Sequence, residues 1–122
     1  MAKDRIVPCI IHVPCQYPDG TQIEPEKLNL IFEALDRQFG GSTPLGIVPG
    51  RWVAPDGTTV VENMHRIEVS VKESAIQAFE LTARQIGRET QQQAMYVIIN
   101  YQGEARLLWA DDDGGGLAAA GS

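Results

Sequence analysis

His12 is the strongest candidate for proton transfer in this sequence of 122 residues. An imidazole has a reference pKa of about 6.5, which suits general acid or base work near neutral pH. Arg66 and Glu68 stand two residues apart, so in an extended segment their side chains share one face. On this interpretation His12 would move a proton, and Tyr96, Asn100 and Arg66 would orient a small aromatic or carbonyl compound. A strand histidine bonded to a neighbouring carboxylate is also an ordinary structural feature, so catalytic and structural interpretations both stay open.

Aromatic and basic side chains offer a second kind of chemistry, the recognition of a planar ring and a phosphate. Trp52 and Tyr96 could stack on a base, while Arg51 or Arg66 could meet an anionic group. Aromatic residues are equally common at the seam of a homodimer. The candidate ligand-binding residues are His12, Arg51, Trp52, Arg66, Glu68, Tyr96 and Asn100.

Two other motifs carry no predicted site. Cys9, His12 and Cys15 are evenly spaced, but alternation along an extended segment turns His12 away from both cysteines, so we expect no metal site. The segment Gly40-Gly41-Ser42-Thr43 follows a predicted helix, whose C-terminal end repels phosphate, and a helix stop is the favoured interpretation. The sequence contains no nucleophile elbow, phosphate-binding loop or dinucleotide fingerprint, and no cofactor is predicted.

The elements that must position these residues follow from hydrophobic spacing. Alternation of apolar and polar residues predicts strands, and spacing of three and four predicts helices. An irregular edge strand is indicated by the Pro and Gly residues between Thr43 and Ala54. Gly87 interrupts the second helix, where it either allows close packing on the sheet or is tolerated. In chain order the predicted elements are strand 6–13, helix 25–39, strand 43–54, strand 59–71, helix 74–91 and strand 95–101, with a short extension at 105–109.

This order predicts an α+β fold, a ferredoxin-like βαββαβ domain with a four-stranded antiparallel sheet and two helices on one face. The helix-covered face takes the alternate apolar residues of the strands. The opposite face is expected to be uncovered and to show Ile10, His12, Arg66, Glu68, Ser70, Tyr96, Ile98 and Asn100. A surface of this mixed character is typical of a dimer contact or a ligand site.

A family resemblance rests on the run from Phe39 to Thr43, the Gly50-Arg51-Trp52 triplet, Asp56-Gly57 and residues 83–89. Over about residues 28–101 the chain resembles a family of small uncharacterised bacterial and phage-encoded proteins with an FGG-x-T and G-x-W pattern. The resemblance implies a single domain and no particular activity.

Composition and charge exclude several classes of protein. Ten Lys and Arg against sixteen Asp and Glu give a net charge of −6, and three acidic residues, Asp111 to Asp113, lie in the last twelve. Such a chain lacks the basic footprint of a nucleic-acid-polymer binder. No apolar run is long enough to span a membrane and no signal peptide is evident, so a cytoplasmic protein is predicted. We expect one domain over residues 1–110 and a disordered acidic, Gly- and Ala-rich tail over 111–122.

Three functions remain open from the sequence, and it favours a binding protein over an enzyme. The first is a homodimer, or a higher homo-oligomer, that holds a small ligand or a partner on the open sheet face. The second is a sequestering protein for a nucleotide-like signal, suggested by the phage-linked resemblance. The third is a small ferredoxin-like monooxygenase or isomerase in which His12 moves a proton.

Overall fold

The computed structural model describes residues 4–100 and 104–111. The predicted tail at 111–122 lies outside these residues except for Asp111. In chain order the elements are β1 (Ile6–Pro14), α1 (Pro25–Phe39), β2 (Thr43–Val53), β3 (Thr59–Lys72), the short 3-10 helix η1 (Glu73–Ala75), α2 (Ile76–Glu89), β4 (Ala94–Ile99) and β5 (Glu104–Trp109).

The protein is an α+β fold built on one five-stranded antiparallel sheet, in the order β2-β3-β1-β4-β5. The sequence predicts four strands, and the structure has five among the described residues. The segment expected as a short extension is β5, which pairs with β4 from Ala94↔Trp109 to Ile99↔Glu104. The sequence did not predict this strand because six residues at a sheet edge carry only a short hydrophobic pattern, and the strand is stabilised by pairing with its neighbour.

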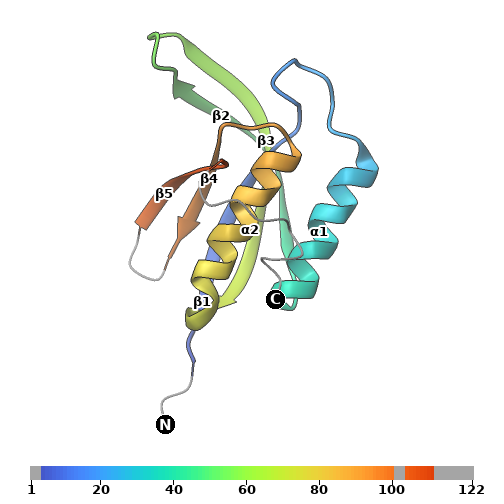
Figure 1. The fold of residues 1–122 in the computed structure, drawn as a ribbon, viewed down its shortest axis with the longest axis vertical. Helices are drawn as coiled ribbons and strands as arrows, with labels where there is room; N and C mark the ends of the chain where they lie inside the picture. Colours follow the sequence, from blue (N-terminus) through green and yellow to red (C-terminus); the bar gives the residue numbers. More distant parts are fainter. Residues whose placement is uncertain (1–3, 101–103, 112–122) are drawn as a thin grey trace.

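Both helices cover the same side of the sheet (Figure 1). Pro25 lies in the first turn of α1, and Gly40 ends the helix in the left-handed conformation with φ of 89°, which confirms the predicted helix stop. The alternation expected for β1, β3 and β4 is confirmed, since these strands turn fully buried apolar side chains toward the helices. The largest buried side chains are Phe79, Ile11, Ile31, Leu35, Ile67, Ile86, Met95, Val7, Val13, Val69, Val71 and Val97.

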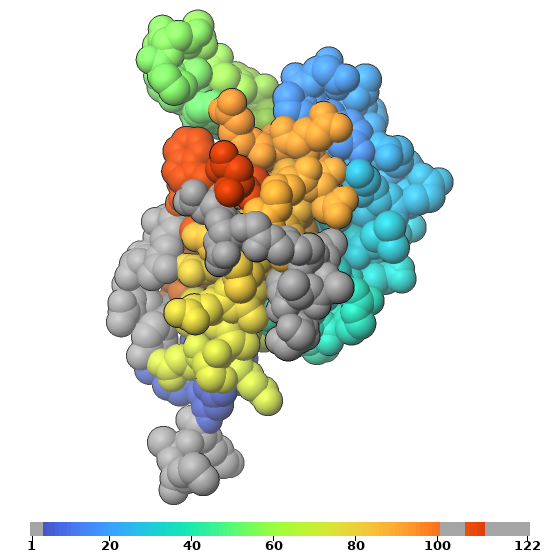
Figure 2. Space-filling view, viewed as in Figure 1, coloured from blue at the N-terminus to red at the C-terminus, as the bar shows by residue number. Residues whose placement is uncertain are grey.

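The far half of the β2–β3 hairpin extends beyond the two helices and stands out from the body (Figures 1 and 2). We call residues 47–63 the hairpin arm. As expected, β2 is an irregular edge strand, with a register shift between Pro44 and Ile47. Several large apolar side chains of the arm are exposed, among them Ile47, Trp52 and Val61. None of the described helices is long and apolar enough to cross a membrane.

Candidate functional site

The face of the sheet opposite the helices carries a row of three predicted site residues on three neighbouring strands. Arg66 of β3 lies opposite His12 of β1, and His12 lies opposite Tyr96 of β4. Residues opposite one another on antiparallel strands project to the same face and contact one another. The register therefore brings together three side chains that are far apart in the sequence.

His12 contacts both of its neighbours directly. The two atoms Arg66 Nη1 and His12 Nε2 are 2.9 Å apart, and His12 Nδ1 lies 3.2 Å from the backbone oxygen of Tyr96. The imidazole also stacks on the Tyr96 ring, with the ring centroids 4.7 Å apart and the planes 10° from parallel. These contacts fix both the position and the rotation of the imidazole.

The same contacts determine which nitrogen of His12 carries the proton. A guanidinium can only donate hydrogen bonds, so Nε2 must accept from Arg66, and a carbonyl can only accept, so Nδ1 must donate to Tyr96. Burial lowers the pKa of His12 below its usual value of 6.5; the hydrogen bond to the Tyr96 carbonyl opposes this change, and the charge of Arg66 adds to it. His12 is therefore a neutral imidazole with its proton on Nδ1 at neutral pH.

The expectation of an uncovered His12 is wrong, because this side chain is only 2% exposed. Its neighbour on the same face, Ile10, is also buried, at 6% exposed. The predicted strand face is the correct one, but the flanking Arg66 and Tyr96 side chains pack against His12. The lone pair that a general base would use is occupied by Arg66, so proton transfer by His12 stays a prediction that needs this bond to open.

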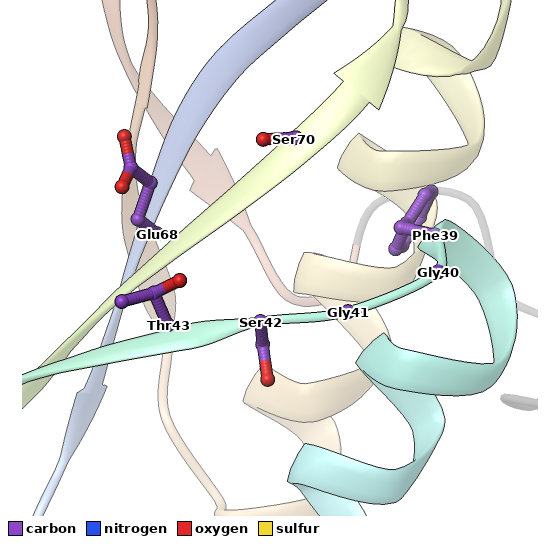
Figure 3. A pocket seen from close by; sticks show the side chains of 7 residues that line it. All are labelled: Phe39, Gly40, Gly41, Ser42, Thr43, Glu68 and Ser70. Carbon is purple, nitrogen blue, oxygen red and sulfur yellow. The ribbon is translucent and has the colours of Figure 1, made fainter.

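Glu68 lies two residues beyond Arg66 on β3 and borders a hollow of about 290 Å³. Thr43, the cross-strand partner of Glu68, and Ser70 line the hollow together with the loop at residues 39–42. Figure 3 shows Ser42 pointing away from Glu68, and its hydroxyl lies 2.6 Å from Asp36 Oδ1. Among the described residues, no hydrogen-bond or ion-pair partner occupies the Glu68 carboxylate, which leaves it available to a cationic ligand.

The structure separates Arg51 and Trp52 from the other candidates. Both residues lie on the hairpin arm, where Trp52 pairs with Val60 and Arg51 with Val61. Val60 lies six positions before Arg66 and Val61 five, which corresponds to about 20 Å and about 17 Å along an extended strand. Consecutive residues also face opposite sides of the sheet, so only Trp52 shares the face of His12. Within one chain these two residues do not join the Arg66–His12–Tyr96 row.

Asn100 lies at the edge of the open face. It follows the last residue of β4, it is exposed, and its backbone N–H donates to the Pro8 oxygen over 3.3 Å. It lies four positions after Tyr96, or about 13 Å along the strand. The structure thus groups His12, Arg66, Tyr96 and the adjoining Glu68, and places Asn100 at the periphery.

Two apolar residues of the open face are absent from the sequence-based set. Leu107 of β5 lies opposite Tyr96, and Trp109 lies opposite Ala94, one position diagonal to Tyr96. Their side chains are 55% and 49% exposed, and that of Tyr96 is 42% exposed, so an apolar and aromatic surface adjoins the polar row. Alternation within residues 105–109 was the available signal, but a face can be assigned only once the pairing of β5 with β4 is known.

The cysteine and histidine pattern near the N-terminus spans both faces of the sheet. Cys9 is buried in the core beneath the helices, while His12 lies on the opposite face. Within the described part of the chain, no group of three or more His, Cys, Asp or Glu side chains is arranged to hold a metal ion.

Comparison with known proteins gives two structural matches. The sequence matches no protein family and no curated protein. The fold is similar to that of a phage SAM lyase solved in complex with S-methyl-5'-thioadenosine, with a TM-score of 0.65 and 16% identity, covering 93% of this chain and 97% of the other. It is also similar to a phage SAM lyase in the apo state, with a TM-score of 0.62, 16% identity and coverage of 93% and 100%. At this identity the likeness concerns the fold.

Proposed function

We propose that this protein binds S-adenosylmethionine (SAM), or an adenosyl thioether related to it, on the open face of its sheet, and that it cleaves SAM as a lyase. The observation that carries the proposal is the Arg66–His12–Tyr96 row beside Glu68, on a fold similar over 93% of the chain to a SAM lyase that holds S-methyl-5'-thioadenosine. The earlier hypothesis of a nucleotide-like ligand for a phage-type protein agrees with this choice.

The side chains of the open face match the parts of such a ligand. Tyr96 and Trp109 offer aromatic surface for the adenine ring, and an aromatic face also attracts a sulfonium cation. The Glu68 carboxylate would stabilise the sulfonium or the amino group by charge. Arg66 would receive the carboxylate of the methionine part, because a guanidinium binds a carboxylate through two parallel hydrogen bonds.

Cleavage would break one carbon–sulfur bond of the sulfonium. The bonding electron pair stays on sulfur, so a cation becomes the neutral thioether S-methyl-5'-thioadenosine. The methionine-derived carbon that loses sulfur then gains a bond from the carboxylate oxygen of its own fragment, which closes a lactone without adding water. A hydrolase would supply that oxygen from water instead. Glu68 would hold the positive charge close to the hollow, and the fixed Arg66 would orient the part of the substrate that departs.

We also propose the remaining features of the protein that the sequence predicts. The unit from β1 to β4 is ferredoxin-like with β5 appended, residues 1–110 form one domain, and the chain belongs with the small phage-encoded proteins that it resembles. The exposed apolar side chains of the hairpin arm, among them Trp52, Ile47 and Val61, support assembly into a homodimer or higher homo-oligomer. A cytoplasmic location follows from a substrate of this class.

The test is a calorimetric titration of the purified protein with SAM and with S-methyl-5'-thioadenosine, followed by mass spectrometry of the SAM reaction. Binding with release of the thioether and a fragment without added water would support the lyase. Binding without turnover would retain the site and overturn the lyase, leaving a sequestering protein. Absence of binding to both compounds at millimolar concentration would refute the whole proposal.

Arg66→Ala and Arg51→Ala form a matched pair of variants for the same titration. We expect Arg66→Ala to weaken SAM binding at least about ten-fold, the equivalent of about 1.4 kcal/mol for a charged hydrogen bond. Arg51→Ala removes the same charge from the arm, about 17 Å away by strand geometry, and should change the affinity less than about two-fold. Equal effects of the two variants would contradict the placement of the site on the open face.

A further inference from the structure

Arg66 is held in place by an unusual partner for an arginine. Its guanidinium donates to His12 Nε2 over 2.9 Å, and within residues 4–100 and 104–111 it forms no salt bridge with a carboxylate. A guanidinium has five N–H donors, so most of them remain for a ligand. Because no carboxylate in the described part of the chain forms an ion pair with it, the positive charge is also retained for a ligand.

We propose that His12 is a positioning residue that orients the Arg66 guanidinium toward an anionic group of the ligand, and that protonation of His12 releases it. This inference rests on the proposed function and deepens it, since it assigns the SAM carboxylate as the group that Arg66 receives. His12 would not touch the ligand and would act through Arg66.

The contacts of His12 explain how it can orient a long flexible side chain. The imidazole is fixed by its hydrogen bond to the Tyr96 carbonyl, by stacking on the Tyr96 ring and by burial, at 2% exposure. An acceptor at a fixed position restricts the conformations that the arginine side chain can adopt. Preorganisation of this kind lowers the entropy lost when the ligand binds.

The groups around His12 determine what acid does to this arrangement. Arg66 faces it from β3 and Tyr96 from β4, with Glu68 further along β3; both helices lie on the opposite side of the sheet. His65 pairs with Val13 and so faces the other side. Protonated His12 would have no acceptor for Arg66 and would place a second cation beside it. Since burial keeps the pKa of His12 below 6.5, release is expected only in mildly acidic solution.

Two probes separate positioning from a general loss of structure. SAM carries a carboxylate, whereas S-methyl-5'-thioadenosine has no carboxylate and needs no guanidinium. As the pH falls through the pKa of His12, we expect the affinity for SAM to decrease about ten-fold, the effect of losing one charged hydrogen bond, while the affinity for the thioether changes less than about two-fold. The carboxylate of SAM stays ionised throughout this range.

Two substitutions complete the experiment, each measured by calorimetry with both probes. His12→Phe keeps a ring for stacking but removes the acceptor, and should weaken SAM about ten-fold at neutral pH without changing the thioether. His12→Gln places an amide oxygen near the former Nε2 and should restore SAM binding with a flat pH profile. The proposal would be overturned if His12→Phe lost equal affinity for SAM and for the thioether. It would also be overturned if the affinity of His12→Gln for SAM still fell with pH as it does in wild type.

Nuclear magnetic resonance of the free protein provides a readout that needs no ligand. Nitrogen chemical shifts should show His12 as the Nδ1–H tautomer. The side-chain N–H signals of Arg66 should report a more mobile guanidinium when His12 is protonated or replaced by Phe. If neither probe binds but these signals behave as expected, the proposed function fails and the positioning contact stands. If Arg66 is equally mobile in wild type and His12→Phe, the positioning role is refuted whatever the ligand.

Discussion

Gly87→Ala is expected to destabilise this protein, although alanine is the better helix former. Gly87 is buried within α2, where the helix packs against the β4–β5 edge of the sheet. A Cβ atom at this position would lie 2.8 Å from the Cβ of Ala110 and 2.8 Å from Cγ of Met95. Real Cβ atoms essentially never approach other atoms this closely, so the helix or its neighbours would have to move.

Two opposing effects decide the magnitude. Replacing Gly by Ala within a helix contributes about 1 kcal/mol through helix propensity. Forcing an extra methyl group into a packed core costs about 1–3 kcal/mol. The Met95 side chain can adjust, but the Ala110 methyl is attached directly to the backbone. We therefore expect the second effect to dominate and the free energy of unfolding to fall by about 1 kcal/mol.

The assay is equilibrium unfolding in urea, monitored by circular dichroism. The dependence of the free energy of unfolding on urea concentration should be the same in wild type and variant, so that a shift of the midpoint reports a change in stability. The double variant Gly87→Ala/Ala110→Gly is the control, because it removes the closest rigid neighbour. The loss for the double variant should be smaller than the sum of the two single losses, as expected for residues in contact. A Gly87→Ala variant that is more stable than wild type by about 1 kcal/mol would show that only helix propensity matters there, and would refute the close packing of α2.

Gly50→Ala tests the same reasoning with the opposite outcome, because its new Cβ would meet only the flexible end of the Met64 side chain and a more distant backbone oxygen. The free energy of unfolding measured in urea should change by less than about 1 kcal/mol, and a larger loss would contradict this reasoning. Thiol labelling at pH 8 should modify Cys15 in the native protein but not Cys9, whose pKa burial raises to about 11; rapid labelling of both would contradict the packing of β1. The contribution of His12 to stability should be constant above pH 6.5 and should fall below it, because the unfolded chain binds a proton at His12 more readily than the folded one; the slope for this group is at most about 1.4 kcal/mol per pH unit. Burial lowers the pKa of His65 as well, so a His12→Phe variant should keep only part of the total slope, and an unchanged slope would refute a contribution from His12.

Local spacing predicted most of the framework. Alternation along β1 and β3 places Cys9, Ile11 and Val69 in the core, and the apolar stripe of α1 ends where Gly40 adopts a left-handed conformation. These features depend on the periods of strand and helix and on the steric freedom of glycine, which neighbouring residues in the chain determine. A sequence therefore contains them without reference to any distant segment.

The pairing of distant segments decided the contacts of the candidate site and the fifth strand. Alternation assigned His12 to the correct face, but its burial, its tautomer and its contact with Arg66 arise because β1 lies between β3 and β4. The same pairing made residues 104–109 a fifth strand and brought Trp109 beside Tyr96.

Distance along the hairpin separated two residues that sequence reasoning had joined to the site. Arg51 and Trp52 have suitable chemistry, but they lie on the hairpin arm, about 17 Å and about 20 Å along the strand direction from Arg66. The amino-acid sequence by itself determined the two helices, the first four strands, and the face on which each residue of β1, β3 and β4 lies. Only the tertiary structure decided which side chains meet, because register couples residues through hydrogen bonds between strands that the local pattern does not encode.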